Sequence, residues 1–193
     1  METLLKRLED IDVSKYNVRR EQYATIFPLN IMPRETIYSV YLEAQKRAMQ
    51  AGIAFLSWVP SQRLVVRQLR PEDLGLPGPD WRFKVRQGRS GLVSYRLRRD
   101  QAIVVYGFYN QSQSPKVFQL EVMKGDERRL IVVLQDLYTK GYDPIGILAE
   151  FEVFRPGEEI RVVGLSLGDG DEELGIMGYV VEPEGRIRRT DVP

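Results

Sequence analysis

Carboxylates are the side chains of this sequence best suited to chemistry, and three of them lie where strands could bring them together. Glu150 and Glu152 stand two residues apart and would share one face of a strand, while Glu121 belongs to another strand-like stretch. Two carboxyl groups about 5–9 Å apart in a cleft are the catalytic pair of a glycosidase. Here the carboxylates alternate with apolar residues, which is typical of a solvated strand face, and we favour that interpretation.

A second acidic group lies in the loop that runs from Gly168 to Glu173. It holds four carboxylates within five positions, and calcium prefers such oxygen-rich loops. The loop lacks the spacing of an EF-hand and is flanked by strand-like stretches rather than helices. We therefore predict an acidic turn and no metal site.

The sequence of 193 residues contains neither histidine nor cysteine. It therefore lacks the commonest general base, the commonest metal ligand and the thiol nucleophile. Disulfides and thiolate zinc sites are excluded for the same reason. We predict a protein that is not an enzyme, uses no cofactor and acts through its surfaces.

Basic residues alternate with apolar ones in two consecutive stretches, 81–86 and 92–98. This period of two predicts a hairpin with one hydrophobic face and one cationic face. The cationic residues are Arg82, Lys84, Arg86, Arg96 and Arg98. Such a face could be solvated, could form a subunit interface, or could bind nucleic acid. Phe83 and Tyr95 fall on the apolar side, where they could not stack on bases, so an interface is favoured over nucleic acid.

The stretch from Trp81 to Arg189 reads as about eight short strands separated by turn residues. Besides the two stretches above, the strand candidates are 102–109, 117–123, 129–134, 146–154, 159–167 and 174–182. Strands at this spacing, with no helical interruption, are typical of an antiparallel β-sandwich or jelly roll. Residues 135–145 form the one long connection and would cross between the sheets.

The strongest helix signal covers residues 34–51. Pro33 suits the first turn, and Gly52 is expected to end the helix. Tyr38, Leu42 and Met49 widen its apolar arc beyond what a surface helix needs, so we expect contacts on two sides. Residues 53–58 and 63–69 are predicted as short strands.

Residues 12–33 have no clean period and cannot bury themselves. We expect residues 1–70 to form an arm, 71–80 a Pro- and Gly-rich linker and 81–193 the sandwich domain. A short helix is predicted over 1–11. The arm residues expected to contact a neighbouring subunit are Tyr16, Tyr23, Ile26, Phe27, Leu29 and Ile31.

Charge is unevenly distributed along a chain whose net charge is only +1. Residues 1–100 hold 18 Lys and Arg against 11 Asp and Glu, and the rest of the chain holds the remaining 10 and 16. The basic side of one copy could therefore meet the acidic side of another. No stretch approaches the ~20 apolar residues of a membrane helix, and no signal peptide is predicted. The lack of cysteine, with abundant Arg, Glu, Pro and Tyr, is compatible with a thermophilic source.

The closing pattern FEVFRPGEEIRVVGLSLGDGDEELGIMGYVVEPEG resembles the last strands of β-sandwich structural proteins of bacterial and archaeal viruses. In those proteins a PGE-type turn leads into a strand, an acidic loop and a final strand. The resemblance covers roughly residues 102–185 and implies a virion component, such as a capsid, decoration, neck or tail subunit. It carries no catalytic or ligand motif.

We therefore expect a self-assembling structural protein, located in the virion and made in the host cytoplasm, whose partners are its own copies or other virion proteins. A carbohydrate-binding module is an alternative, with an aromatic platform around Tyr106, Tyr109 or Tyr142. A nucleic-acid-binding protein that uses the basic hairpin is another. For a protein outside a virus, the expected compartment is the cytoplasm.

Overall fold

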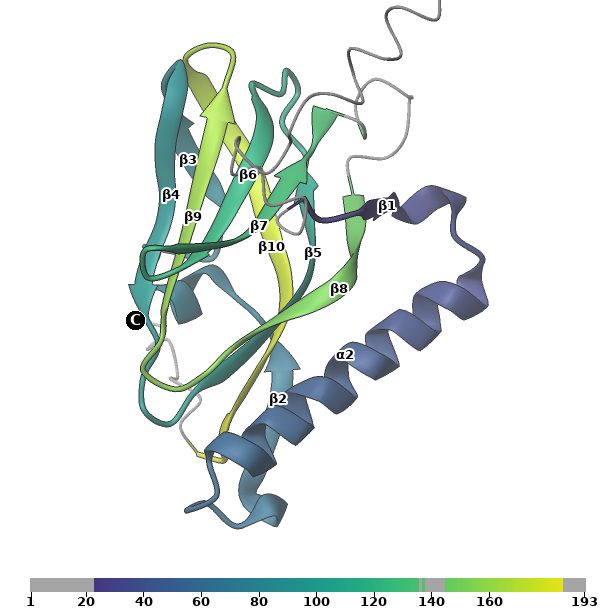
Figure 1. Ribbon diagram of the computed structural model, residues 1–193, viewed down its shortest axis with the longest axis vertical. Coiled ribbons are helices and arrows are strands. Elements are labelled where there is room, and N and C mark those ends of the chain that lie inside the picture. The colour runs from purple at the N-terminus through teal and green to yellow at the C-terminus, as the bar shows by residue number, and fades with distance from the viewer. Residues whose placement is uncertain (1–22, 136, 138–144, 186–193) are drawn as a thin grey trace, which may run out of the picture.

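Two antiparallel β-sheets packed face to face form the body of the protein (Figure 1). The computed structural model describes residues 23–135, 137 and 145–185. In the six-stranded sheet the order is β1 (Ile26–Pro28), β8 (Ile145–Phe154), β5 (Ala102–Asn110), β10 (Gly170–Pro183) and β2 (Leu64–Gln68), with β3 (Arg82–Val85) also on β10. In the four-stranded sheet it is β4 (Gly88–Arg96), β9 (Glu159–Ser166), β6 (Val117–Lys124) and β7 (Glu127–Val133). The predicted mainly-β sandwich is confirmed.

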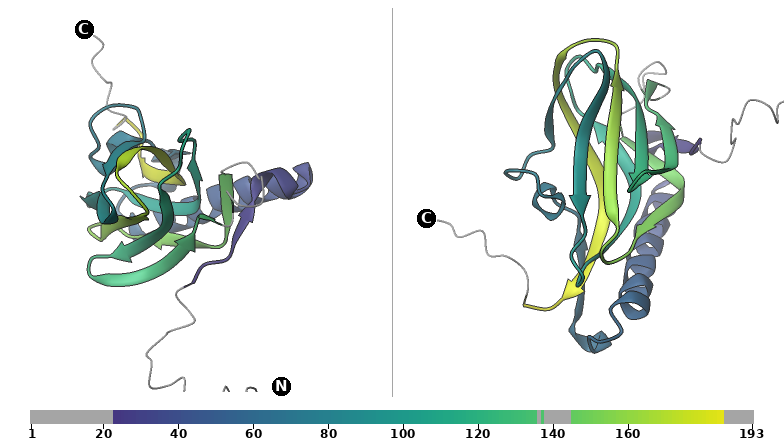
Figure 2. Two further views of the ribbon diagram at one scale, coloured as in Figure 1. Left: turned by 90° about the horizontal axis from the view of Figure 1, so that it is seen from above. Right: turned by 60° about the vertical axis from the view of Figure 1, so that its left-hand side comes forward.

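A helix adds a third layer on the outer face of the six-stranded sheet. This helix, α2 (Arg34–Phe55), lies on the side away from β4 and β9, as the right view of Figure 2 shows. Strand β5 is therefore covered twice: Val104 and Tyr106 pack in the helix-side cluster, whereas Ile103, Val105 and Phe108 pack in the core between the sheets. Burial on both faces explains why β5 carries no charged residue and is polar only at its last position, Asn110.

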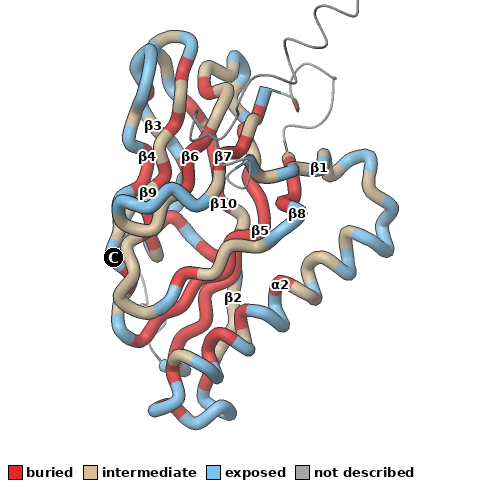
Figure 3. The backbone as a smooth tube through the Cα atoms, viewed as in Figure 1, coloured by how far each residue is buried: buried red, intermediate tan, exposed pale blue. Residues whose placement is uncertain are grey.

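Small residues allow α2 to approach the sheet closely. Its buried positions run from the middle of the helix towards its C-terminal end (Figure 3) and are Ala44, Ala48, Ala51 and Gly52. A Cβ atom on Gly52 would lie 2.5 Å from Cγ2 of Val181 on β10, so any side chain there would force the two elements apart.

Gly52 does not end the helix, contrary to the sequence-based prediction. Helix α2 continues to Phe55, and the amide of Leu56 donates to the Gly52 carbonyl at 2.8 Å. The predicted strand over residues 53–58 does not form, because its first half is helical. The helix packs through this last turn, where Leu56 is fully buried among residues of β2 and β10.

The described part of the predicted arm contributes strands to the same sheet as the sandwich. Strand β1 pairs with β8, with Ile26 opposite Leu148, and β2 pairs with β10. Just before β1, Tyr23 forms a parallel bridge to Ile131 of β7. Residues 23–28 thus run from the edge of the small sheet to the edge of the large one. The predicted helix over 1–11 lies outside the described residues.

The predicted linker also packs against the body. It contains a short 3-10 helix, η5 (Pro71–Leu74), whose Pro71 and Leu74 are buried. The side chain of Asp73 is bound by both terminal nitrogens of Arg67 at 2.6 Å. These contacts attach η5 to strand β2.

Strand β10 carries a buried carboxylate, Glu182, which is 1% exposed. Its two oxygens accept hydrogen bonds from Nε of Arg67 at 2.9 Å and from Nη2 of Arg98 at 2.6 Å. The hydrogen bond with Asp73 and the charges of Asp73 and Glu182 raise the pKa of Arg67 above its ordinary value, against burial, which lowers it. The resulting charge network joins β2, η5, β10 and the turn after β4.

We expect Glu182→Gln to lower the free energy of unfolding by about 3 kcal/mol, because Arg67 and Arg98 would lose their shared counter-charge in a buried setting. Glu184→Gln is the matched control, since Glu184 is exposed two residues further along and should change stability by less than about 0.5 kcal/mol. Urea denaturation measures both. Equal effects of the two substitutions would contradict the proposed contribution of the network.

Candidate functional site

The predicted cationic hairpin does not form. Strand β3 pairs with β10 in the large sheet, whereas β4 pairs with β9 in the small sheet. The chain crosses from one sheet to the other between Val85 and Gly88. The alternation of polar and apolar residues in both strands is real, but a period of two does not specify the pairing partner.

Two of the five predicted interface cations are used within the fold. Arg98 bonds Glu182 and lies 3.3 Å from an oxygen of Asp100. Nε of Arg96 donates to the carbonyl of Gly157 at 3.1 Å. These contacts connect the end of β4 to neighbouring strands and turns, so Arg96 and Arg98 have structural partners.

The other three predicted cations, Arg82, Lys84 and Arg86, are exposed. In the register of β3 with β10, Arg82 lies opposite Glu173 and Lys84 opposite Asp171. Arg82 and Lys84 therefore each have a carboxylate residue opposite them on β10. This end of β3 is a surface of mixed charge.

The predicted arm residues divide into two groups. Ile26 and Leu29 are partly buried against the core clusters, so they belong to the fold. Three others expose large apolar side chains: Tyr23, Phe27 and Ile31. Tyr16 lies outside the described residues.

Helix α2 exposes an apolar stripe beside its sheet-facing side. Tyr38 is 65% exposed, Leu42 47% and Ile53 53%, and Met49 is half-buried between them along the helix. At about 100° per residue these four side chains fall within an arc of about 60°. We call them the α2 stripe. The sequence predicted contacts on two sides of this helix; the sheet covers one side, and the α2 stripe lies exposed on the other.

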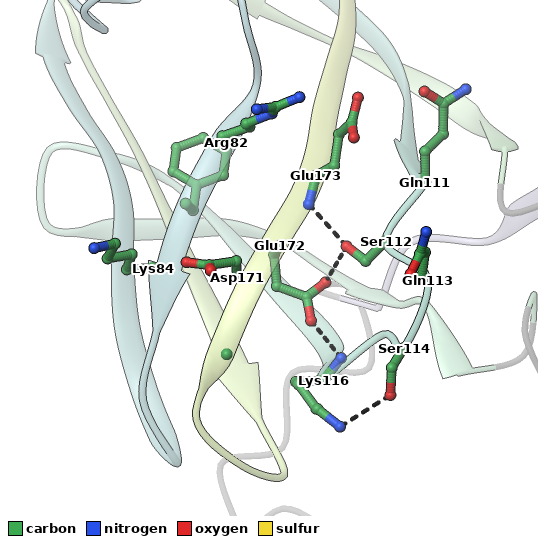
Figure 4. Close-up of a pocket in the computed structure, with 12 residues that line it drawn as sticks. Arg82, Lys84, Gln111, Ser112, Gln113, Ser114, Lys116, Asp171, Glu172 and Glu173 are labelled. Carbon is green, nitrogen blue, oxygen red and sulfur yellow. Dashed lines mark hydrogen bonds between the residues drawn. The ribbon is translucent and has the colours of Figure 1, made fainter.

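A polar trough of ≈ 740 Å³ lies over the first residues of β10 (Figure 4). One wall is β3, from Arg82 to Lys84, and the other is the loop that follows β5, residues 111–116. The base is formed by Gly170–Glu173 of β10. Sequence reasoning did not find this site, because its residues come from three distant segments.

A buried carboxylate holds the loop wall of the trough. Glu172 is 1% exposed and accepts hydrogen bonds from Nδ2 of Asn110 at 2.6 Å, from Oγ of Ser112 at 2.9 Å and from the amide of Lys116. Oγ of Ser112 in turn accepts from the amide of Glu173 at 2.7 Å. The acidic stretch is thus more than a solvated turn: one of its members fixes a neighbouring loop.

The carboxylates considered for catalysis are not paired with one another. Glu121 is buried and bonded to Arg89, Glu152 lies 2.9 Å from the ammonium of Lys124, and Glu150 is exposed. Each of the first two is neutralised by a cation. Within residues 23–135, 137 and 145–185, no group of three or more acidic residues could hold a metal ion.

The tyrosines considered for sugar stacking are mostly enclosed. Tyr106 is buried, stacks on Tyr179 with ring centroids 5.4 Å apart and meets Tyr41 edge-on at 5.7 Å. Burial, and then the neighbouring tyrosines, raise the pKa of Tyr106 well above its ordinary value. Tyr109 is partly buried, and Tyr142 lies outside the described residues. Tyr106 cannot offer a stacking face.

No family model, no curated protein and no solved structure matches this chain. In the part of the chain that the structure describes, no helix is both long and apolar enough to span a membrane. The site must therefore be judged on its own geometry.

We expect the protein to lose stability above about pH 10, where tyrosine ionises in an unfolded chain. The folded pKa of Tyr106 is raised, so its neutral form favours the fold; that contribution is complete below about pH 10 and is lost as the pH rises further. Between about pH 8 and about pH 11, the free energy of unfolding should therefore fall less for Tyr106→Phe than for the parent. Denaturant titrations at both pH values measure this.

Tyr38→Phe, at an exposed position of α2, is the matched control for this pH experiment and should follow the parent. If Tyr106→Phe and the parent lost the same free energy over the interval, the enclosed phenol would have no part in the alkaline sensitivity.

Proposed function

We propose that this protein is a non-enzymatic structural subunit that associates with further copies of itself, with the α2 stripe as a contact surface. The observation that carries the proposal is the exposure of Tyr38, Leu42 and Ile53 along one side of a helix whose other side is already packed. Apolar side chains aligned over several helical turns gain free energy when a partner covers them.

The stripe is complementary to itself in an antiparallel arrangement. A twofold axis between Gln45 and Lys46 places Tyr38 opposite Ile53 of the second copy and Leu42 opposite Met49. The contact would extend over 16 residues, or about 22 Å of helix. A twofold contact uses the same patch on both subunits, which is the commonest arrangement in homo-oligomers.

The free energies of burial and association indicate that one such contact is weak. Covering a large apolar side chain contributes about 1.5–3 kcal/mol, so the exposed part of the stripe gives only a modest gain per subunit. Association costs about 4–15 kcal/mol in lost freedom of motion. We therefore propose an assembly of many copies with more than one contact, to which exposed Phe27 and Ile31 would add.

The finer proposal is a virion component, such as a capsid, decoration, neck or tail subunit. It is supported by the resemblance of residues 102–185 to β-sandwich proteins of bacterial and archaeal viruses, and by a sandwich with an additional helix that presents an apolar face. Nucleic-acid binding by a basic hairpin and sugar stacking on a platform around Tyr106 have less support. The predicted basic face is divided between two sheets, and Tyr106 is enclosed.

We expect the double substitution Leu42→Glu with Ile53→Glu to shift the protein towards monomers, because association would bury two added charges in the contact. Sedimentation velocity over a range of protein concentrations gives the mass distribution. The matched control is Gln50→Glu, which adds a charge at an exposed position on another side of the same helix and should leave association unchanged.

Circular dichroism must show the same helix and strand content for all three proteins. A parent that stays monomeric at every concentration would contradict the proposed self-association. An oligomer that survives the double substitution unchanged would place the contact elsewhere.

A further inference from the structure

The walls and base of the polar trough carry side chains whose hydrogen-bonding capacity is unused. Within residues 23–135, 137 and 145–185, six lining side chains make no hydrogen bond or ion pair to another side chain or to the backbone. They are Arg82, Lys84, Gln111, Gln113, Asp171 and Glu173. Figure 4 shows them distributed over both walls and the base. A dense group of unpaired polar side chains at the surface is typical of a binding site rather than of a structural network.

The framework beneath these free groups is held in place. Glu172 accepts three hydrogen bonds from residues 110–116 and is almost fully buried, so the loop wall has a defined position relative to β10. The other wall, β3, is hydrogen-bonded to β10 over four residue pairs. A ligand would therefore meet preorganised walls and would lose little affinity to ordering the protein.

The charges that line the trough nearly cancel, so a strongly charged ligand gains little net attraction. Arg82, Lys84 and Lys116 bring three positive charges, and Asp171 and Glu173 bring two free negative ones. The attraction of a phosphate or polyanion to the basic groups is offset by repulsion from the carboxylates, and the reverse holds for a polycation. A ligand that carries many neutral donors and acceptors meets no such penalty, because each hydroxyl can donate to a carboxylate and accept from a cation or amide.

The backbone within the trough is already paired, which disfavours an added peptide strand. One edge of Gly170–Glu173 pairs with β3. On the other side, Glu173 accepts from the amide of Gln111 at 2.8 Å and donates its own amide to Ser112. A peptide that binds by strand addition needs a free sheet edge, and β10 offers none at the base, so recognition at the base must use side chains.

We propose that the polar trough binds a neutral oligosaccharide. At the base, Asp171 and Glu173 accept hydrogen bonds from sugar hydroxyls. On one wall, Arg82 and Lys84 donate hydrogen bonds to sugar oxygens. On the opposite wall, the side-chain amide of Gln113 both donates and accepts. The site is separate from the tyrosine platform that the sequence indicated, and it is independent of the α2 stripe, which belongs to a different element.

The test uses the full chain labelled with ¹⁵N and the neutral probes cellotetraose, maltotetraose and triacetylchitotriose. The side-chain NH₂ resonances of Gln111 and Gln113 report on the loop wall directly. We expect at least one probe to shift these resonances saturably, with a millimolar dissociation constant that changes little with salt. No shift with any probe at tens of millimolar would overturn the proposal. Shifts with a heparin tetrasaccharide alone, lost at high salt, would also overturn it.

Two variants separate the site from non-specific binding. Asp171→Asn removes the charged acceptor while keeping the shape, and we expect it to weaken binding about tenfold. Gln113→Ala removes the amide on the opposite wall and should have a comparable effect. The control, Glu150→Gln, changes an exposed carboxylate of β8 outside the trough and should bind like the parent. Equal affinities for all four proteins would place the sugar elsewhere and overturn the assignment.

Discussion

Two carboxylates buried on one long strand determine how the rest of the chain is arranged. Glu182 and Glu172 lie near opposite ends of β10, and each is almost completely shielded from water. A buried charge is costly unless partners neutralise it or donate hydrogen bonds to it. Glu182 therefore requires Arg67 and Arg98, which fixes β2, η5 and the turn after β4. Glu172 requires donors from residues 110–116, which fixes the loop beside the trough.

Much of the fold could be predicted from the sequence, because the strands are short, alternate in polarity and are separated by turn residues. The eight strands expected after Trp81 all form. The predictions that were wrong concern pairing and packing with residues far away in the chain. The stretches 81–86 and 92–98 read as a hairpin, yet each pairs with a strand more than 60 residues later. Likewise, Gly52 looks the same in sequence as a helix-ending glycine, but the close approach of Val181 is what requires it.

The candidate surfaces were predictable to different degrees for the same reason. Tyr38, Leu42 and Met49 lie on a single helix, so helical spacing alone indicated an apolar arc wider than one contact needs. Ile53 was missed because the helix was expected to end before it. The trough could not be foreseen, since Arg82, Gln113 and Asp171 meet only when β3 and the loop after β5 flank β10. The polar residues 110–115 stand between two predicted strands, with nothing in the sequence to indicate what lies beside them.

The outermost strands of the two sheets give this molecule a further property: resistance to uncontrolled fibre growth. Strands β1 and β2 are only three and five residues long, and β4, although longer, is interrupted by a bulge between Gly91 and Val93. Strand β7 begins with the charged residues Glu127, Arg128 and Arg129, all exposed. Short, kinked or charged borders make poor templates for another chain. Strand-by-strand polymerisation is therefore disfavoured even where the protein is concentrated.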